Sequence, residues 1–165
     1  MRRNLLTFCA ALFITVLACN KSNDNVTIHC DGLINNKPAG DPAFLLVASA
    51  FTPNSDGLND FFNPIISQIS SMSVKVYDIN SNLVYQGSLG SALWSPVTTS
   101  NPLNMKYYYR VQATTTSGNM IGICGEVTPM TCVPKGHTKS EYTFQDQATP
   151  NGFTGVTAEV LVSCN

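Results

Sequence analysis

Apolar and polar side chains alternate along several short stretches of this chain, with the period of two that is typical of half-buried β-strands. Met72, Val74 and Val76 alternate with polar neighbours, and the turn-forming residues 80–82 lead into a second short apolar run. We therefore predict a β-hairpin over residues 72–86.

A second hairpin is predicted farther along the chain. A turn at 117–119 separates a tyrosine-rich run, 106–114, from a returning run, 120–127. One face of the first run carries Tyr107, Tyr109, Val111 and Ala113. Alternation turns Tyr108 to the opposite face, where we expect it to be exposed.

Three other stretches complete the predicted strands. Residues 26–30 form a short strand candidate, 44–51 an apolar strand suited to burial, and 156–162 another alternating strand. One face of the last carries Val156, Ala158, Val160 and Val162. Only residues 65–72 could form a helical turn, and the serine and β-branched residues there disfavour it. Short strands separated by Gly, Pro and Asn turns predict an all-β, antiparallel β-sandwich.

The first residues are predicted to be an export signal that takes no part in the fold. Arg2 and Arg3 precede an almost uninterrupted apolar run, Leu5–Leu17. A helix of that run is about 20 Å long, which is shorter than the ~30 Å hydrocarbon core of a membrane. Such a run is typical of a cleaved secretory signal.

The end of this signal, Val16-Leu17-Ala18-Cys19, resembles a bacterial lipobox, in which the cysteine is diacylated and begins the mature chain. We predict a lipoprotein signal peptide at 1–18, lipidation at Cys19 and a polar tether at 19–25. The alternative is an ordinary signal that is cleaved near a cysteine. Acyl chains would hold the protein on a membrane. The expected location is the cell envelope, as an outer-membrane lipoprotein that is periplasmic or surface-exposed.

The remaining cysteines agree with export. Cys9 lies in the signal and Cys19 is the lipidation site, so four of the six cysteines remain, which in an oxidising compartment predicts two disulfides with three possible connectivities. They are Cys30, Cys124, Cys132 and Cys164. A straight strand would hold the middle two too far apart to be bridged without a tight reversal. We therefore prefer bridges from the two outer cysteines to the 124–132 region; a metal site is disfavoured because no Cys-x-x-Cys spacing occurs.

Composition and charge exclude several classes of protein. The charged fraction is 12% and the hydrophobic fraction 44%, which argues against a coiled coil and against charge-driven disorder. A net charge of −1 leaves no basic surface for nucleic acid. Neither a Gly-x-Ser-x-Gly motif nor a phosphate-binding glycine loop is present, and His29 and His137 lie far apart in sequence. We expect no enzymatic activity.

The segment Phe51-Thr52-Pro53-Asn54-Ser55-Asp56-Gly57-Leu58-Asn59-Asp60-Phe61 closely resembles the opening of the gliding motility-associated C-terminal domain, the type B sorting domain of the type IX secretion system in Bacteroidetes. A strand pair, Trp94 and the tyrosine-rich run follow in the family's order. The resemblance covers residues 44–130 and implies an immunoglobulin-like β-sandwich. We expect one domain over 26–165, with this family-like core and an extra C-terminal segment, 131–165.

Four oxygen-bearing side chains crowd around Gly57 in this segment. They are Asn54, Asp56, Asn59 and Asp60. Calcium prefers oxygen ligands, so a calcium site is one interpretation, and calcium is the only cofactor that the sequence suggests. The alternative is a turn in which these side chains bind backbone amides.

Two functions are compatible with these patterns. The first is a lipid-anchored envelope protein whose β-domain is a structural or adhesive module that binds another envelope protein or a polysaccharide. The alternative is a sorting or docking element of the type IX secretion and gliding machinery. Trp94 and Tyr107, Tyr108 and Tyr109 could form an aromatic binding platform, although alternate tyrosines are expected to pack in the core.

Overall fold

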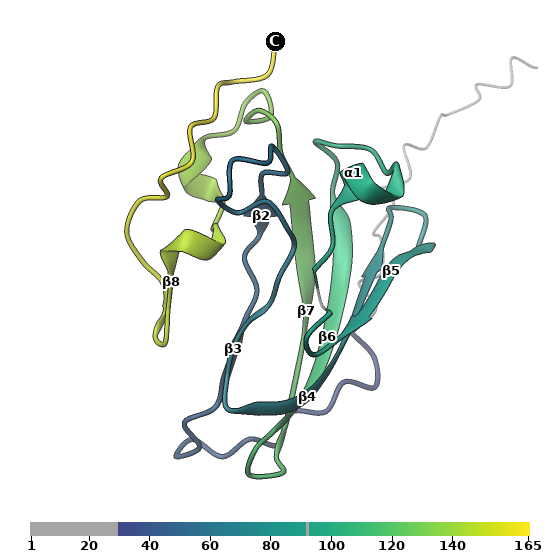
Figure 1. Cartoon of the computed structure of the whole chain (residues 1–165), viewed down its shortest axis with the longest axis vertical. Helices are drawn as coiled ribbons and strands as arrows, with labels where there is room; N and C mark the ends of the chain where they lie inside the picture. The colour runs from purple at the N-terminus through teal and green to yellow at the C-terminus, as the bar shows by residue number, and fades with distance from the viewer. Residues whose placement is uncertain (1–29, 92) are drawn as a thin grey trace, which may run out of the picture.

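The computed structural model describes residues 30–91 and 93–165, and this part of the chain is mostly β-strand (Figure 1). The predicted signal peptide, Cys19, the tether and residues 26–29 of the first predicted strand lie outside it. The strands are β1 (Phe44–Leu46), β2 (Ala50–Phe51), β3 (Ile65–Ser67), β4 (Ile69–Tyr77), β5 (Leu83–Ser88), β6 (Tyr107–Thr115), β7 (Met120–Pro129), β8 (Ala148–Thr149) and β9 (Gly152–Phe153). Short helical segments are α1 (Pro96–Thr99) and the 3-10 turns η1 (Lys139–Glu141) and η2 (Gln145–Gln147).

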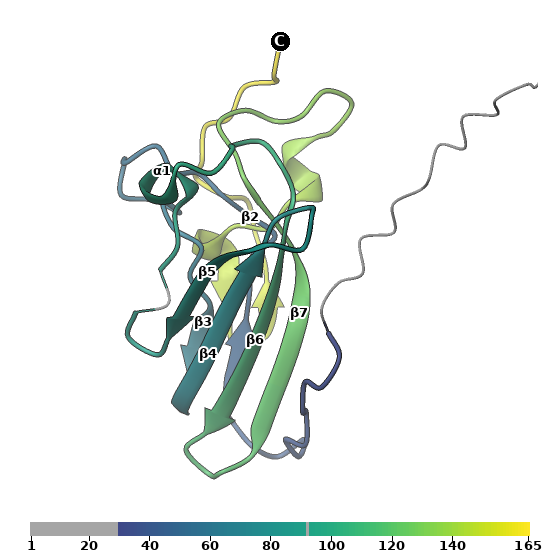
Figure 2. The same cartoon turned by 90° about the vertical axis from the view of Figure 1, so that its right-hand side faces the viewer.

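Both predicted hairpins are present and form the centre of a five-stranded sheet in the order β2-β7-β6-β4-β5. Figure 2 shows β5, β4, β6 and β7 side by side, with β3 behind them. In the antiparallel β4–β6 pair, Val74 lies opposite Val111 and Val76 opposite Tyr109. The face that alternation predicted to be apolar is therefore continuous from one hairpin to the other.

The prediction of a single strand over 44–51 was wrong, whereas residues 65–72 lack a helix, as their residue types indicated. The apolar stretch 44–51 is two strands, because β1 pairs with β3 in a separate two-stranded sheet whereas β2 pairs in parallel with β7. The other edge of β2 is also occupied, since the Ala50 amide donates to the Thr143 carbonyl over 3.0 Å. Residues 65–72, the one helical candidate, form β3 and the start of β4.

The main core lies between the five-stranded sheet and the segment that contains β1 and β3. The sheet contributes Val74, Val76 and Val111, each with no exposed surface, and the covering segment contributes Leu45 and Phe62. A second, smaller cluster joins β2 to the C-terminal segment. It consists of Ala50, Met130, Val133 and Phe144, with Tyr142 and Leu161 packed against it.

The predicted strand 156–162 is not a strand, and its faces are reversed. Val156, Val160 and Val162 are 87%, 90% and 69% exposed, whereas Thr157 and Glu159 are buried. The polar face turns inward because Thr157 and Glu159 form hydrogen bonds there, to Asp146 and Asn59. Just beyond this segment, a parallel bridge joins Val133 and Ser163.

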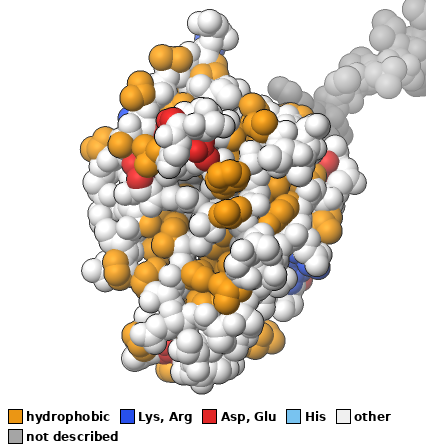
Figure 3. All heavy atoms as spheres, viewed as in Figure 1, with side chains coloured by type: hydrophobic (Ala, Val, Ile, Leu, Met, Phe, Trp, Pro, Cys, Tyr) orange, Lys and Arg blue, Asp and Glu red, His pale blue; other side chains and the backbone are white. Residues whose placement is uncertain are grey.

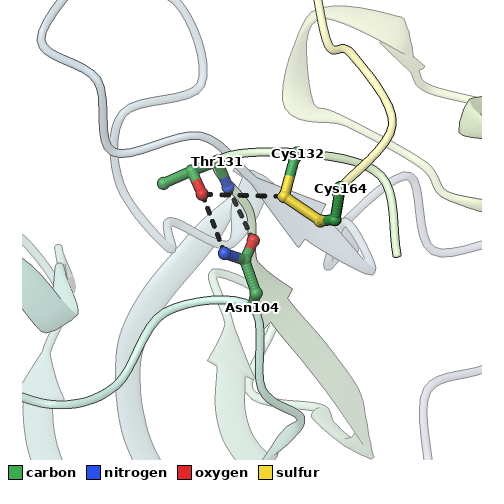
Figure 4. The surroundings of a disulfide bond; sticks show 4 residues. All are labelled: Asn104, Thr131, Cys132 and Cys164. Carbon is green, nitrogen blue, oxygen red and sulfur yellow. Dashed lines mark hydrogen bonds between the residues drawn. A yellow bond between two sulfur atoms is a disulfide. The ribbon is translucent and has the colours of Figure 1, made fainter. Parts of the chain in front are cut away.

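The four cysteines form two disulfides that join the ends of the described chain to β7 and to the segment just after it. Cys30 is bonded to Cys124 and Cys132 to Cys164, with sequence separations of 94 and 32. At the second disulfide, Asn104 and Thr131 exchange two hydrogen bonds of 2.8 Å (Figure 4). The C-terminal segment is thus cross-linked next to the loop that precedes β6.

Just after Cys30, the N-terminal segment passes closely over β7. Residues 33 and 34 pass the strand at Gly122, where a Cβ atom would lie 2.8 Å from the Leu33 Cβ and 2.9 Å from the Ile34 carbonyl oxygen. The Gln112 side chain accepts from the Ile34 amide over 2.8 Å and donates to its carbonyl over 2.9 Å. A side chain at position 122 would therefore push the N-terminal segment off the sheet.

Asp41 makes the stability of the fold depend on pH. Hydrogen bonds lower the pKa of Asp41 from 3.8 to about 2, with Ser117 the largest contributor, followed by Asn119 and the Ala43 amide. Because the folded-state pKa is depressed, the stabilisation is present above pH 3.8 and is lost as pH falls toward 2. Asp41→Asn is expected to flatten this part of the pH dependence, measured as the free energy of urea unfolding between pH 6 and pH 2. The same acid-induced loss in the variant and the wild type would contradict it.

Within the described residues, no helix has the length and apolar character needed to cross a membrane.

Candidate functional site

The resemblance segment forms a loop, residues 52–60, between two buried aromatic residues. Phe51 and Phe62 are 1% and 2% exposed, and both rings contact Trp94, with centroid distances of 5.7 and 6.4 Å. The backbones of Phe62 and Trp94 also exchange two hydrogen bonds, of 2.7 and 3.1 Å. The core therefore clamps the loop at both ends.

Polar side chains of the loop bind its own backbone. Asn54 accepts from the Asp56 amide over 3.0 Å, and Asp56 accepts from the Leu58 amide over 2.8 Å. Asp60 accepts from the amides of Ser55 and Gly57 over 2.5 and 2.8 Å. The contacts of Asn54 and Asp56 are Asx-type turns, in which the side chain binds the backbone two residues on, whereas Asp60 reaches back to close the loop.

Three loop residues have left-handed backbone conformations, which explains the residue types found there. Ser55, Gly57 and Asn59 have φ angles of 65°, 90° and 50°. Glycine adopts this region without steric cost, and asparagine tolerates it better than most residues. The spacing of Gly57 and Asn59 in the motif is therefore required by the course of the loop.

The structure turns one of the four proposed calcium ligands, Asn59, away from the other three. The oxygens of Asn54, Asp56 and Asp60 face the amides of their own loop, while Asn59 points the other way, toward the C-terminal segment. No cluster of three or more His, Cys, Asp or Glu suited to a metal is found in the part of the chain that the structure describes. The geometry thus matches the turn alternative.

The inner side of the loop is held by residues far away in sequence. The Asn59 side-chain amide donates to Asp146 over 3.2 Å and to Glu159 over 3.1 Å, and its oxygen accepts from the Asp146 amide over 3.1 Å. The Thr52 hydroxyl also donates to Glu159. Figure 1 shows the yellow C-terminal segment beside this end of the molecule.

Glu159 is the most deeply buried carboxyl group among the described residues. Its residue is 2% exposed, and one of its oxygens, Oε2, has no hydrogen-bond partner. The backbone carbonyl of the same residue accepts from the Lys139 ammonium over 2.8 Å. Asp146 is satisfied by Thr157 and by the Ala158 amide, over 2.9 and 2.7 Å. These contacts turn the polar face of 156–162 inward.

Asn59→Ala is expected to lower the free energy of unfolding by about 2–3 kcal/mol, because it removes one donor from each of two carboxylates, leaves the Asp146 amide without its acceptor and puts alanine at a positive φ angle. Asn59→Gly removes the same side-chain hydrogen bonds, but glycine adopts a positive φ angle without strain. The free energy of unfolding should therefore fall less than in Asn59→Ala. Urea denaturation of both variants measures the difference. Equal losses would show that backbone conformation contributes nothing at this position.

The outer side of the loop faces a groove of about 300 Å³. The loop contributes Pro53, Ser55, Gly57, Asp60 and Phe61, and the region of α1 contributes Ser95, Val97 and Thr98. Figure 3 shows red acidic and orange apolar side chains close together on the upper part of one face. The sequence pattern pointed to the loop, but it had no signal for α1 as its neighbour.

The predicted aromatic platform is mostly core. Trp94 and Tyr107 are 1% and 2% exposed, with ring centroids 4.9 Å apart. Burial raises the pKa of Tyr109 to about 12. Tyr108 is also buried, at 7%, contrary to prediction, because it lies on a central strand between Tyr77 and Glu126 of the neighbouring strands.

The described histidine lies apart from the loop. His137 Nδ1 is 2.7 Å from Glu141 Oε2, and the hydrogen bond from His137 is the main reason why the pKa of Glu141 is lowered. Both side chains are about half exposed. His29 lies outside the described residues.

Comparison with known families identifies the region that contains the loop. Residues 45–123, slightly less than half of the chain, match the model of the CHU_C type IX secretion signal domain. This part of the chain is similar to that family. The match confirms the resemblance drawn from the motif, and a type IX secretion signal domain indicates a cell-envelope or secreted protein of Bacteroidetes. No curated protein and no solved structure is significantly similar to the chain.

The type IX domain ends, in this match, before the residues that hold its loop from the inner side. Asp146 and Glu159 lie beyond residue 123, in the C-terminal segment. Sequence reasoning missed both of them. The only available signal was the alternation of polar residues with valines at 156–162. That pattern predicts buried valines, whereas the structure buries Thr157 and Glu159 instead.

Proposed function

We propose that the type IX domain of this chain is a sorting element, recognised by the type IX secretion machinery during export. The family match to residues 45–123 carries the proposal. The loop supports it, because Asn54, Asp56 and Asp60 bind backbone amides and so fix the shape of an exposed surface. A defined loop clamped on a buried aromatic cluster is a suitable recognition element.

The arrangement of the strands supports the fold that the family implies. We propose an immunoglobulin-like β-sandwich in which the β1–β3 pair covers the five-stranded sheet. The shared core, with Leu45 and Phe62 on one side and Val74 and Val111 on the other, is what such a packing requires. We also propose that 26–165 fold as one domain, since the C-terminal segment packs on β2 and on the loop.

The sorting role is tested by following the full chain to the surface of cells with and without a working type IX apparatus. The test variant replaces residues 53–60 with a Gly-Ser sequence of equal length, and the control replaces the β4–β5 turn, residues 80–82, in the same way. We expect wild type and control to become accessible to added protease only when the apparatus is present, and the loop variant to remain inside. Delivery that does not depend on the apparatus would refute the proposal.

We further propose that Cys19 carries a lipid and attaches the protein to the outer membrane. The order of basic residues, a short apolar run and Ala18-Cys19 supports this. Labelling with a palmitate analogue should mark the wild type but not Cys19→Ala. Label that persists in the variant would overturn it.

A second candidate function is adhesion to another envelope protein or to a polysaccharide. The edge position of β5 favours it, because among residues 30–91 and 93–165 β5 pairs only with β4, and its sequence, Leu83–Ser88, carries no charge that would discourage strand addition. Deletion of residues 44–130 separates the two functions. A sorting element would lose surface delivery, whereas an adhesive module would be delivered and lose its association with envelope components. In either case we propose that the protein is not an enzyme.

A further inference from the structure

The groove beside the loop exposes apolar side chains that the core does not use. Phe61 is 42% exposed and Val97 is 59% exposed, although each is adjacent to buried neighbours, Phe62 and Pro96. Both side chains line the groove of about 300 Å³ between the loop and α1. An exposed apolar pair beside a concave surface is typical of a binding site rather than of a solvated loop.

The same groove is acidic. Asp60 lines it and Asp56 lies in the same loop, while no lysine or arginine is among the lining residues. The ion pairs that the structure describes lie elsewhere, at Lys106–Glu126 and His137–Glu141. The two aspartates accept hydrogen bonds from uncharged groups, which leaves their negative charge uncompensated, and a carboxylate retains further acceptor sites.

We propose that this groove binds an extended segment of a partner protein in the export machinery, in which a lysine or arginine stands next to an apolar residue. The apolar side chain packs on Val97 and Phe61, and the cation lies at the carboxylates of Asp60 and Asp56. Charge complementarity selects this occupant, because an acidic segment would be repelled and a wholly apolar one would desolvate the aspartates without supplying a cation. The inference rests on the proposed sorting function and names the partner's chemistry.

Substitutions of one exposed residue separate apolar contact from charge. Val97→Lys and Val97→Glu both remove the apolar contact, but only the first places a cation against a basic partner. The matched controls are Val160→Lys and Val160→Glu, at a valine that is 90% exposed on the C-terminal segment. Both positions face solvent, so the urea midpoints of all four variants should match that of the wild type.

The measurement is the rate at which the full-length protein becomes protease-accessible on intact cells that have the type IX apparatus. We expect Val97→Glu to slow delivery about tenfold, as for the loss of one packed apolar side chain. Val97→Lys should slow it about fivefold more, the size of an exposed charge interaction. The Val160 variants should be delivered like the wild type.

The other outcomes overturn different parts of the inference. Val97 variants that are delivered at the wild-type rate would exclude the groove and leave the sorting function intact. Equal slowing by lysine and glutamate would exclude a basic partner. Wild-type delivery that is the same without the apparatus would refute the sorting function itself, and the inference with it.

Discussion

Replacing Cys30 and Cys124 with serine is expected to lower the free energy of unfolding by about 4–5 kcal/mol. This disulfide joins residues 94 positions apart, so its loss restores much conformational freedom to the unfolded chain. It also releases the segment that crosses β7 at Gly122, where Gln112 binds the backbone of Ile34. Urea denaturation of the oxidised wild type and the double serine variant measures the loss.

The second disulfide is the natural control for this prediction. Cys132 and Cys164 are 32 positions apart, so replacing both with serine should cost about 1 kcal/mol less than replacing the first pair. A larger loss at the second pair would show that local packing of the C-terminal segment, rather than loop length, dominates the effect of these bonds.

Trp94→Ala is expected to lower the free energy of unfolding by about 3–5 kcal/mol, the usual cost of removing a fully buried aromatic side chain. Trp94 is 1% exposed, and its ring contacts those of Phe51, Phe62 and Tyr107. Because Phe51 and Phe62 flank the 52–60 loop and hold its ends, the cavity forms where the loop is anchored. Amide exchange within residues 52–60 should therefore accelerate more than exchange in the centre of β6.

Two substitutions control for this result. Trp94→Phe keeps an aromatic ring in the same place and should cost less than the alanine variant. Leu93→Ala removes a neighbouring side chain that is 50% exposed and should change the free energy of unfolding by no more than about 0.5 kcal/mol. If the alanine variant at 94 were as stable as Leu93→Ala, the clamp would have no energetic importance.

A loop held on both sides explains how an exposed segment can present a constant surface. Its polar side chains satisfy the backbone within the loop, and the aromatic clamp fixes both ends. On the inner side, Asn59 and Thr52 bind Glu159 of the C-terminal segment. In this protein the residues after the type IX domain are therefore part of the support of its loop rather than a loose tail.

Sequence patterns predicted a structure correctly where that structure depends on residues close together in the chain. Alternation at Met72, Val74 and Val76 placed the first hairpin correctly, and the motif around Gly57 indicated a turn before any contact was known. Both depend on neighbours within a few positions in sequence. The family resemblance followed from the same short segment and was confirmed by the match over 45–123.

The faces and neighbours of other segments could not be read in this way. Alternation at 156–162 showed two different faces but not which one is buried, and the valines proved to be outside because Glu159 meets Asn59, 100 positions away. Burial of Tyr108 depends in the same way on the strands beside it.

The amino-acid sequence by itself therefore indicated the two hairpins, a turn around Gly57 and the resemblance to a secretion-signal family, since each arises from residues close together along the chain. Only the tertiary structure decided that α1 forms the far wall of the groove, that the polar face of the C-terminal segment supports the loop, and which cysteines pair. These features bring together residues tens of positions apart. Each of them is stabilised by packing or hydrogen bonds between distant segments, which the residue pattern of one segment alone does not reveal.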